Sequence, residues 1–253
     1  MANPDPRATI VVIPARLASA RLPEKPLAEI GGLPMIVQVW KRAMEADIGP
    51  VVVAAGDPAI AEAVSAHGGE AVLTDPDLPS GSDRITAALA EIDPERRYQR
   101  VVNLQGDLPT IDPGLLAAVL RPLDILDTDI ATLAVATTDP AECCDPNVVK
   151  AIIAFHQVDD PAVAGLGRAL YFTRATAPSG PGPVYHHIGI YAYQRTALER
   201  FATLPPSPLE RRERLEQLRA LEHGMTIGVA RVDTVPLGVD TPEQLAEARR
   251  ILG

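Results

Sequence analysis

Short β-rich runs alternate with helical patterns through the first half of the chain, and this alternation limits what the sequence can fold into. Strands are predicted at residues 9–14, 51–55, 70–73 and 100–104, and helices at residues 35–46, 59–67 and 83–92. The strand segments are almost continuously apolar, as in parallel strands that are buried on both faces. The sequence therefore predicts an α/β fold with a mostly parallel central sheet and helices on both faces.

The pattern changes after about residue 125. Strands follow one another there with few helices between them, at residues 130–136, 149–155, 169–172 and 188–193. We expect these strands to form a mixed or antiparallel extension of the sheet. A charged helix is predicted from the proline cluster at residues 205–208 to about His223, and then a strand at 227–232 and a helix at 242–252. Thr241 has the features of the N-cap of that last helix, with Pro242 at its first position and Gln244 completing a capping box.

Length and composition fit one globular domain, because the chain has 253 residues and 47% of them are hydrophobic. We divide this domain, residues 1–253, into a first part at about 8–125 and a second at about 126–235. The net charge of -10 disfavours nucleic acid and anionic membranes as partners. Residues 1–6 lack the features of a signal peptide, and the adjacent Cys143 and Cys144 indicate a reducing compartment. We therefore expect a cytoplasmic protein.

A basic loop directly follows the first predicted strand. It carries three cations in ten residues, Arg16, Arg21 and Lys25. Loops at the carboxyl ends of strands bind the ligand in open α/β sheets, and arginine and lysine suit a polyanion such as a nucleoside triphosphate. The glycines of a Walker A or dinucleotide motif are missing, so side chains must hold the phosphates here. The alternative interpretation is a solvated basic loop.

Two aspartates stand at places where a metal ion could be held. Asp107 follows the strand at residues 100–104, and Asp240 precedes the last helix. If both lie at the ligand edge of the sheet, they can share a cation, and Mg²⁺ prefers carboxylate, phosphate and water oxygens. Either aspartate alone has a simpler interpretation as a helix or loop cap. Together with the basic loop they favour a metal–nucleotide site.

His186 and His187 precede a predicted inner strand, and Glu216 with Gln217 lies in the charged helix. A structural histidine and a solvated polar pair are the alternatives to a binding role. A series of motifs gives these residues more weight. They are, in order: Ile-Pro-Ala-Arg at 13–16 with Ser19, Arg21 and Lys25; Ser-Gly-Ser-Asp-Arg at 80–84; Asn-Leu-Gln-Gly-Asp at 103–107; Asp-Pro-Asn at 145–147 with Lys150; Leu-Tyr-Phe-Thr-Arg-Ala at 170–175; His-Ile-Gly-Ile-Tyr at 187–191; Ser-Pro-Leu-Glu at 207–210; Leu-Glu-Gln-Leu-Arg at 215–219; and Gly-Val-Asp-Thr-Pro at 238–242.

With these motifs the chain, from about residue 9 to 251, resembles the CMP-KDO synthetases, the cytidylyltransferases for 3-deoxy-manno-octulosonate (KDO). The resemblance implies a Rossmann-like nucleotidyltransferase sheet, a homodimer, and Mg²⁺-dependent transfer of CMP from CTP to an acidic sugar in lipopolysaccharide biosynthesis. It assigns nucleotide binding to the first part of the domain, and sugar binding and dimerisation to the second.

The resemblance also implies a role for individual residues. Arg16, Lys25 and Asp107 would act in catalysis, and Asp107 and Asp240 would hold the metal. The nucleotide would be bound by Ala15, Arg16, Ser19, Arg21, Lys25, Ser80, Gly81, Arg84 and Gln105. The sugar acid would be bound by Arg174, His187, Tyr191, Glu216 and Gln217.

The chain departs from the family pattern at a few positions. Leu108 stands where the family usually has glutamate, Pro79 replaces a usual glutamine, and Glu24 replaces a usual glycine. The loop between Arg174 and His187 is shorter than the family pattern. Two alternatives therefore stay open: a cytidylyltransferase for another sugar acid or an amino-substituted KDO analogue, and a catalytically silent nucleotide sensor.

Overall fold

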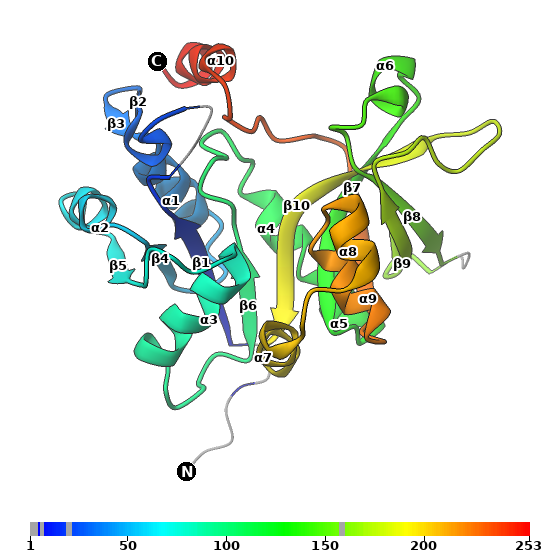
Figure 1. The fold of residues 1–253 in the computed structure, drawn as a ribbon, viewed down its shortest axis with the longest axis horizontal. Coiled ribbons are helices and arrows are strands. Elements are labelled where there is room, and N and C mark those ends of the chain that lie inside the picture. The colour runs from blue at the N-terminus through cyan, green and yellow to red at the C-terminus, as the bar shows by residue number, and fades with distance from the viewer. Residues whose placement is uncertain (1–4, 6–7, 19–21, 157–159) are drawn as a thin grey trace. The chain divides into compact units, whose positions relative to one another are not determined.

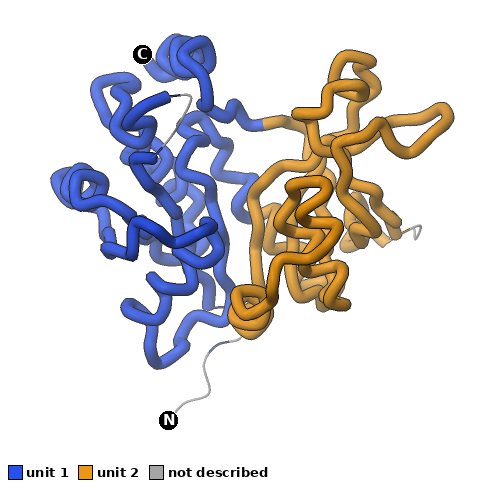
Figure 2. The backbone as a smooth tube through the Cα atoms, viewed as in Figure 1, with its two compact units in different colours: residues 1–117, 236–253 blue, residues 118–235 orange. Residues whose placement is uncertain are grey.

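The computed structural model describes residue 5 and residues 8–18, 22–156 and 160–253 (Figure 1). The chain forms two compact units (Figure 2). Unit 1 contains residues 1–117 and 236–253, and unit 2 contains residues 118–235. The last helix thus belongs with the N-terminal half of the chain. That nucleotide and sugar bind to different parts of the chain stays a prediction.

Unit 1 contains four parallel strands in the order β5 (Glu70–Leu73), β4 (Val51–Ala55), β1 (Thr9–Ala15) and β6 (Arg100–Asn103). Almost every residue of β1 and all of β4 are buried, which explains their continuous apolar sequence. The helices that contact these strands are α1 (Met35–Glu45), α2 (Pro58–Ser65) and α3 (Gly81–Ile92). The parallel arrangement places the ends of β1 and β6 at the same edge.

The C-terminal helix α10 (Pro242–Leu252) packs on a small hairpin of β2 (Glu29–Ile30) and β3 (Leu33–Pro34). A separate apolar cluster joins them, made of Ile30, Met35, Val239, Leu245 and Ala248. Gly31 has φ +56°, and a Cβ there would lie 2.6 Å from the Leu252 carbonyl oxygen, so glycine is required at this turn. The predicted capping box of α10 is confirmed. These contacts hold the segment that carries Asp240 within unit 1, together with the N-terminal half of the chain.

Unit 2 contains five strands in the order β10 (Val184–Gln194), β7 (Ile130–Thr137), β11 (Ile227–Val232), β9 (Leu166–Thr173) and β8 (Lys150–Phe155). Only the β7–β11 pair is parallel among these neighbours. β8 also pairs with β10, through Lys150 and His186. The short helices of this region are α4 (Gly114–Ala118), which crosses the unit boundary in sequence, α5 (Arg121–Leu126), α6 (Pro140–Cys144), α7 (Arg195–Thr203), α8 (Pro208–Glu213) and α9 (Gln217–Glu222).

The predicted α/β class with a mixed extension is confirmed, but the set of strands as a whole is mixed and not mostly parallel. The reason lies in the connections of unit 2. About a dozen residues or more are needed for a parallel crossover, and the described residues between the paired strands β8 and β9 form no helix.

The single charged helix predicted from the proline cluster at residues 205–208 to about His223 is wrong. Two helices are present, and Arg214 ends the first with φ +57°, in the left-handed region. No helix in the described part of the chain has the length and apolar character needed to cross a membrane.

Candidate active site

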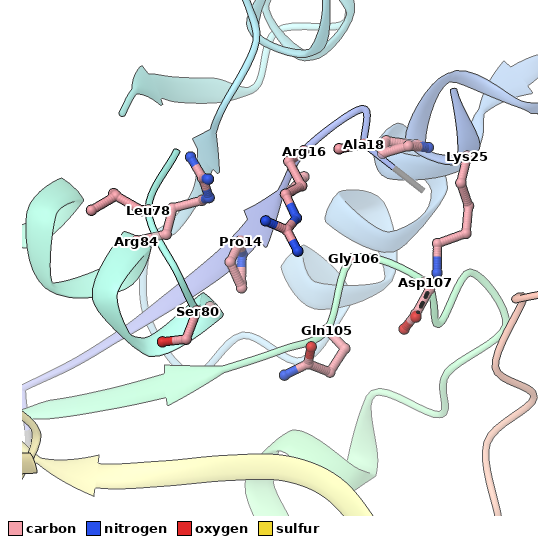
Figure 3. Close-up of a pocket in the computed structure, with 13 residues that line it drawn as sticks. Pro14, Arg16, Ala18, Lys25, Leu78, Ser80, Arg84, Gln105, Gly106 and Asp107 are labelled. Carbon is pink, nitrogen blue, oxygen red and sulfur yellow. Dashed lines mark hydrogen bonds and ion pairs between the residues drawn. The ribbon is translucent and has the colours of Figure 1, made fainter. Parts of the chain in front are cut away.

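A cavity of about 240 Å³ lies in unit 1, where β1 and β6 end (Figure 3). Its lining joins the basic loop, the start of α3 and the loop after β6, and consists of Pro14, Ala15, Arg16, Ala18, Lys25, Pro26, Leu78, Ser80, Gly81, Arg84, Gln105, Gly106 and Asp107. The structure therefore brings together the described residues that the sequence assigns to nucleotide binding. Ser19 and Arg21, from the same predicted set, lie outside the described residues.

Close backbone packing shapes this cavity. A Cβ at Gly106 would lie 3.1 Å from the Pro14 carbonyl oxygen, so the loop after β6 can approach β1 only with glycine or after a small shift. The basic loop is fixed at its start, because the Leu17 N–H donates to Asp57 Oδ2 at 2.9 Å. Glu24 precedes Lys25 with φ 51°. This left-handed conformation favours glycine, the residue that the resemblance leads us to expect at that position.

Lys25 lies between the two predicted metal-binding aspartates. Its Nζ donates to Asp107 Oδ2 at 2.8 Å and to Asp240 Oδ1 at 2.9 Å. Two backbone interactions hold the aspartates in place: the Val239 N–H donates to the Asp107 carbonyl at 2.9 Å, and the Asp240 N–H donates to Gln244 Oε1 at 2.8 Å. Burial alone would lower the pKa of Lys25, but the two carboxylates outweigh it and raise the pKa. Lys25 is therefore charged at neutral pH.

These two carboxylates fit a magnesium ion. Both carboxylates already contact one cation, the Lys25 ammonium group. Mg²⁺ typically binds one or two carboxylates together with substrate phosphates and water. No group of three or more histidine, cysteine, aspartate or glutamate side chains suited to a metal occurs among the described residues. Phosphate and water oxygens would have to supply the remaining ligands.

Arg84 and Ser80 line the cavity on the side away from Lys25 (Figure 3). Arg84 is 2% exposed, and its Nη1 donates to Thr74 Oγ1 at 2.5 Å and to the Asp75 carbonyl at 3.0 Å. Burial lowers the pKa of Arg84, and the positive charge of Arg16 lowers it further. Ser80 caps α3, since its Oγ accepts from the Asp83 N–H at 3.1 Å. Both side chains thus support local backbone structure, and contact with cytidine stays a prediction.

The residues predicted to bind the sugar lie in unit 2. Arg174 follows β9, and its Nε and Nη1 donate to the carbonyls of Glu213 and Pro146, each at 3.0 Å. Glu216 is the N-cap of α9 and Gln217 its first residue, which is buried. Burial, and then the nearby Tyr193 and Glu216, raise the pKa of Tyr191 well above its ordinary value.

His187 is buried in β10 beside Tyr191, with their ring centroids 5.5 Å apart. Its Nε2 lies 3.0 Å from Thr132 Oγ1, which also donates toward the Ile188 and Ile190 carbonyls. A hydroxyl has one hydrogen, so when it donates to a carbonyl its oxygen accepts from His187 Nε2–H. This assigns the ring hydrogen to Nε2 and leaves Nδ1 as an acceptor. Burial, and then His186, lower the pKa of His187 to about 3.

This low pKa makes folding sensitive to acid. An unfolded chain protonates His187 near pH 6.5, whereas the folded chain does so only near pH 3, so the free energy of unfolding falls as pH drops below about 6.5. The expected contribution is about 1.4 kcal/mol per pH unit. The free energy of unfolding, measured with urea, should decrease less from pH 7 to pH 5 in His187→Gln than in the unchanged protein. Equal decreases would exclude a buried neutral His187.

Sequence reasoning missed three supporting residues, Asp57, Thr132 and Glu213. Glu213 lies in a run of charged residues that reads as a solvated helix face, and Thr132 lies within an apolar strand. Their partners are distant in sequence, by 40 residues for Asp57 and Leu17. No local pattern could have identified them.

Comparisons with known proteins identify the family of the chain. The cytidylyltransferase family model matches residues 10–227. The 3-deoxy-manno-octulosonate cytidylyltransferase of Parvibaculum lavamentivorans is 62% identical over 243 residues, which cover 96% of this chain and 92% of the relative. That of Rhodospirillum centenum is also 62% identical, over 98% of this chain and 94% of the relative.

A solved structure gives the same result. The structure of CMP:2-keto-3-deoxy-manno-octonic acid synthetase complexed with CTP superimposes with a TM-score of 0.87 at 37% identity, over 97% of this chain and 98% of that one. A 4-diphosphocytidyl-2C-methyl-D-erythritol synthase from Anaerococcus prevotii, 12% identical with a TM-score of 0.63, shares the fold. The chain therefore belongs to the cytidylyltransferase family, and within it to the 3-deoxy-manno-octulosonate cytidylyltransferases, the CMP-KDO synthetases.

Proposed function

We propose that this protein transfers CMP from CTP to KDO, giving CMP-KDO and pyrophosphate, and that the reaction needs Mg²⁺. The observation that carries the proposal is the convergence of Asp107, Asp240 and Lys25 beside a cavity that also contains Arg16. Relatives at 62% identity bear the name of this activity, and a related solved structure is complexed with CTP.

The reaction requires alignment and neutralisation of charge more than a covalent nucleophile. The anomeric hydroxyl oxygen of the sugar forms a bond to the α-phosphorus of CTP and its proton passes to water, while the bond from that phosphorus to the pyrophosphate oxygen breaks. Lys25 and Arg16 stabilise the negative charge on the triphosphate. Asp107 and Asp240 would hold Mg²⁺, which when bound neutralises and orients phosphate oxygens.

Arg174 recognises the carboxylate of the sugar acid in this proposal. Its two hydrogen bonds to backbone carbonyls fix the guanidinium group and use two of its five N–H donors. His187 Nδ1, Tyr191, Glu216 and Gln217 read the hydroxyl groups. The cytoplasmic location, and assembly as a homodimer through the second part of the chain, are further parts of the proposal.

Arg174→Ala is expected to raise the KM for KDO about ten- to 100-fold, because a charge-assisted hydrogen bond contributes about 1.5–3 kcal/mol. The KM for CTP should change much less. Steady-state kinetics with each substrate varied in turn separates the two effects. An unchanged KM for KDO would remove Arg174 from the sugar site.

A panel of nucleotides and sugar acids tests the proposed specificity. The purified protein should release pyrophosphate from CTP with KDO, and much less from ATP, GTP or UTP. A higher kcat/KM for an amino-substituted KDO analogue, or for another sugar acid, would change the assigned substrate. Binding of CTP without turnover of any sugar acid would make the chain a nucleotide sensor.

A further inference from the structure

Four polar groups of Arg174 form hydrogen bonds with neighbouring residues: its backbone N–H, its carbonyl, Nε and Nη1. Its N–H donates to Glu213 Oε2, its Nε to the Glu213 carbonyl and its Nη1 to the Pro146 carbonyl, each at 3.0 Å. Its carbonyl accepts from Lys150 Nζ, also at 3.0 Å. Backbone and guanidinium are thus fixed together. An exposed arginine that acts only in surface solvation needs no such arrangement.

Glu213 is the centre of this arrangement. Besides the Arg174 N–H, its carboxylate accepts from Thr173 Oγ1 at 2.9 Å and from the Tyr171 hydroxyl at 3.4 Å. Burial alone would raise the pKa of Glu213, but these hydrogen bonds outweigh it and lower the pKa. The side chain is therefore an ionised acceptor that holds the last turn of α8 against the end of β9.

Glu213 also connects two groups of residues in the proposed sugar site. It is the last residue of α8, and Glu216 and Gln217 begin α9 directly after the turn at Arg214. The two helices are tied together, because Arg219 donates to both carboxylate oxygens of Glu210, at 2.8 and 2.5 Å. A contact from Glu213 to β9 therefore sets the position of Arg174 and of the α9 start at once.

Lys150 also supports Arg174, through the Arg174 carbonyl. Its side chain is fully buried, and Nζ donates to the Asp145 and Val148 carbonyls at 2.8 and 2.7 Å as well as to Arg174. All three N–H donors of the ammonium group are used. The same hydrogen bonds order the segment that offers the Pro146 carbonyl to Arg174.

We propose that Glu213, assisted by Lys150, is the positioning residue of the sugar-acid subsite: it holds Arg174 and the start of α9 in the geometry that binds the substrate carboxylate. This inference rests on the proposed function, since it takes Arg174 as the contact to the sugar acid. Glu213 itself touches no substrate in this account. It acts by removing the rotational freedom of Arg174 before substrate binds.

The test compares Glu213→Ala, Glu213→Gln and Tyr171→Phe in steady-state kinetics with KDO and CTP. Glu213→Ala should raise the KM for KDO between about tenfold and about 100-fold, with the KM for CTP changed less than about twofold. Glu213→Gln should recover most of the loss, because its amide oxygen still accepts from the Arg174 N–H. Tyr171→Phe, the matched control, removes only the longest contact and should leave both KM values nearly unchanged.

A double-mutant cycle with Arg174→Ala separates the inference from the proposed function. If Glu213 acts through Arg174, Glu213→Ala should add little to the KM for KDO in the Arg174→Ala background. Full additivity, or a Glu213→Ala variant that only melts earlier with an unchanged KM for KDO, would overturn the positioning role while leaving Arg174 in the site. If Arg174→Ala itself has no effect on this KM, the assigned sugar contact fails and the positioning role fails with it.

Discussion

Asp107→Asn and Asp240→Asn are each expected to lower kcat about 100-fold or more at ordinary Mg²⁺ concentrations. Each change replaces a charged carboxylate with a neutral amide, which is a poor Mg²⁺ ligand. Loss of residues that merely support metal ligands already costs about 10- to 100-fold, so loss of a ligand should cost at least as much. Pyrophosphate release at a series of Mg²⁺ concentrations measures the effect, which should be partly reversed at high concentration.

The fold should survive both changes. The side chains of Asp107 and Asp240 are 30% and 41% exposed, and partly exposed ion pairs contribute at most about 1 kcal/mol. Asp112→Asn is the matched control, because Asp112 is an exposed aspartate in the same loop and accepts from the Gly114 N–H. A near-normal rate in either variant at ordinary Mg²⁺ would show that the residue is not a ligand.

Lys25→Met is expected to lower kcat/KM for CTP about ten- to 100-fold, the effect of losing one charge-assisted contact to phosphate. A second effect follows from the ion pairs of Lys25 with both aspartates. Mg²⁺ must compete with the ammonium group for Asp107 and Asp240, so in the absence of CTP the variant should bind Mg²⁺ more tightly than the unchanged protein. The two effects have opposite directions, which a general loss of structure would not produce.

Melting temperature and titration calorimetry with Mg²⁺ alone measure the second effect. Mg²⁺ should raise the melting temperature of Lys25→Met more than that of the unchanged protein, since two carboxylates without a cation repel each other. Lys41→Met, which removes an exposed lysine from α1, is the control. Equal Mg²⁺ responses, combined with unchanged kinetics, would make Lys25 a purely structural residue.

The elements with strong local signals were predictable from sequence. β4, β5 and β11 have the predicted bounds, because each is a short apolar run between clear breaks. The N-terminus of α10 was predictable to the residue, since Thr241, Pro242 and Gln244 all act locally. Arg214 shows where such reasoning fails: a left-handed residue that is not glycine leaves no mark in the sequence, so one helix was expected where two exist.

For the candidate site, the sequence predicted only the types of residue and the edge of the sheet at which they lie. The sequence predicted that Asp107 and Asp240 could share a metal ion. In this structure both carboxylates contact the Lys25 ammonium group, and the metal stays a prediction. The support of Arg174 was not predictable, because Glu213 contacts it across 39 residues of sequence. Leu108, where the family usually has glutamate, is buried at 8% exposure.

The central claim is that this chain joins CMP to KDO with loss of pyrophosphate. The most direct measurement incubates the purified protein with CTP, KDO and Mg²⁺, and follows phosphorus by ³¹P NMR. The account predicts a new phosphodiester signal from CMP-KDO and an equal amount of pyrophosphate, both absent when Mg²⁺ is chelated. Formation of CDP and phosphate, or equal product without Mg²⁺, would contradict it.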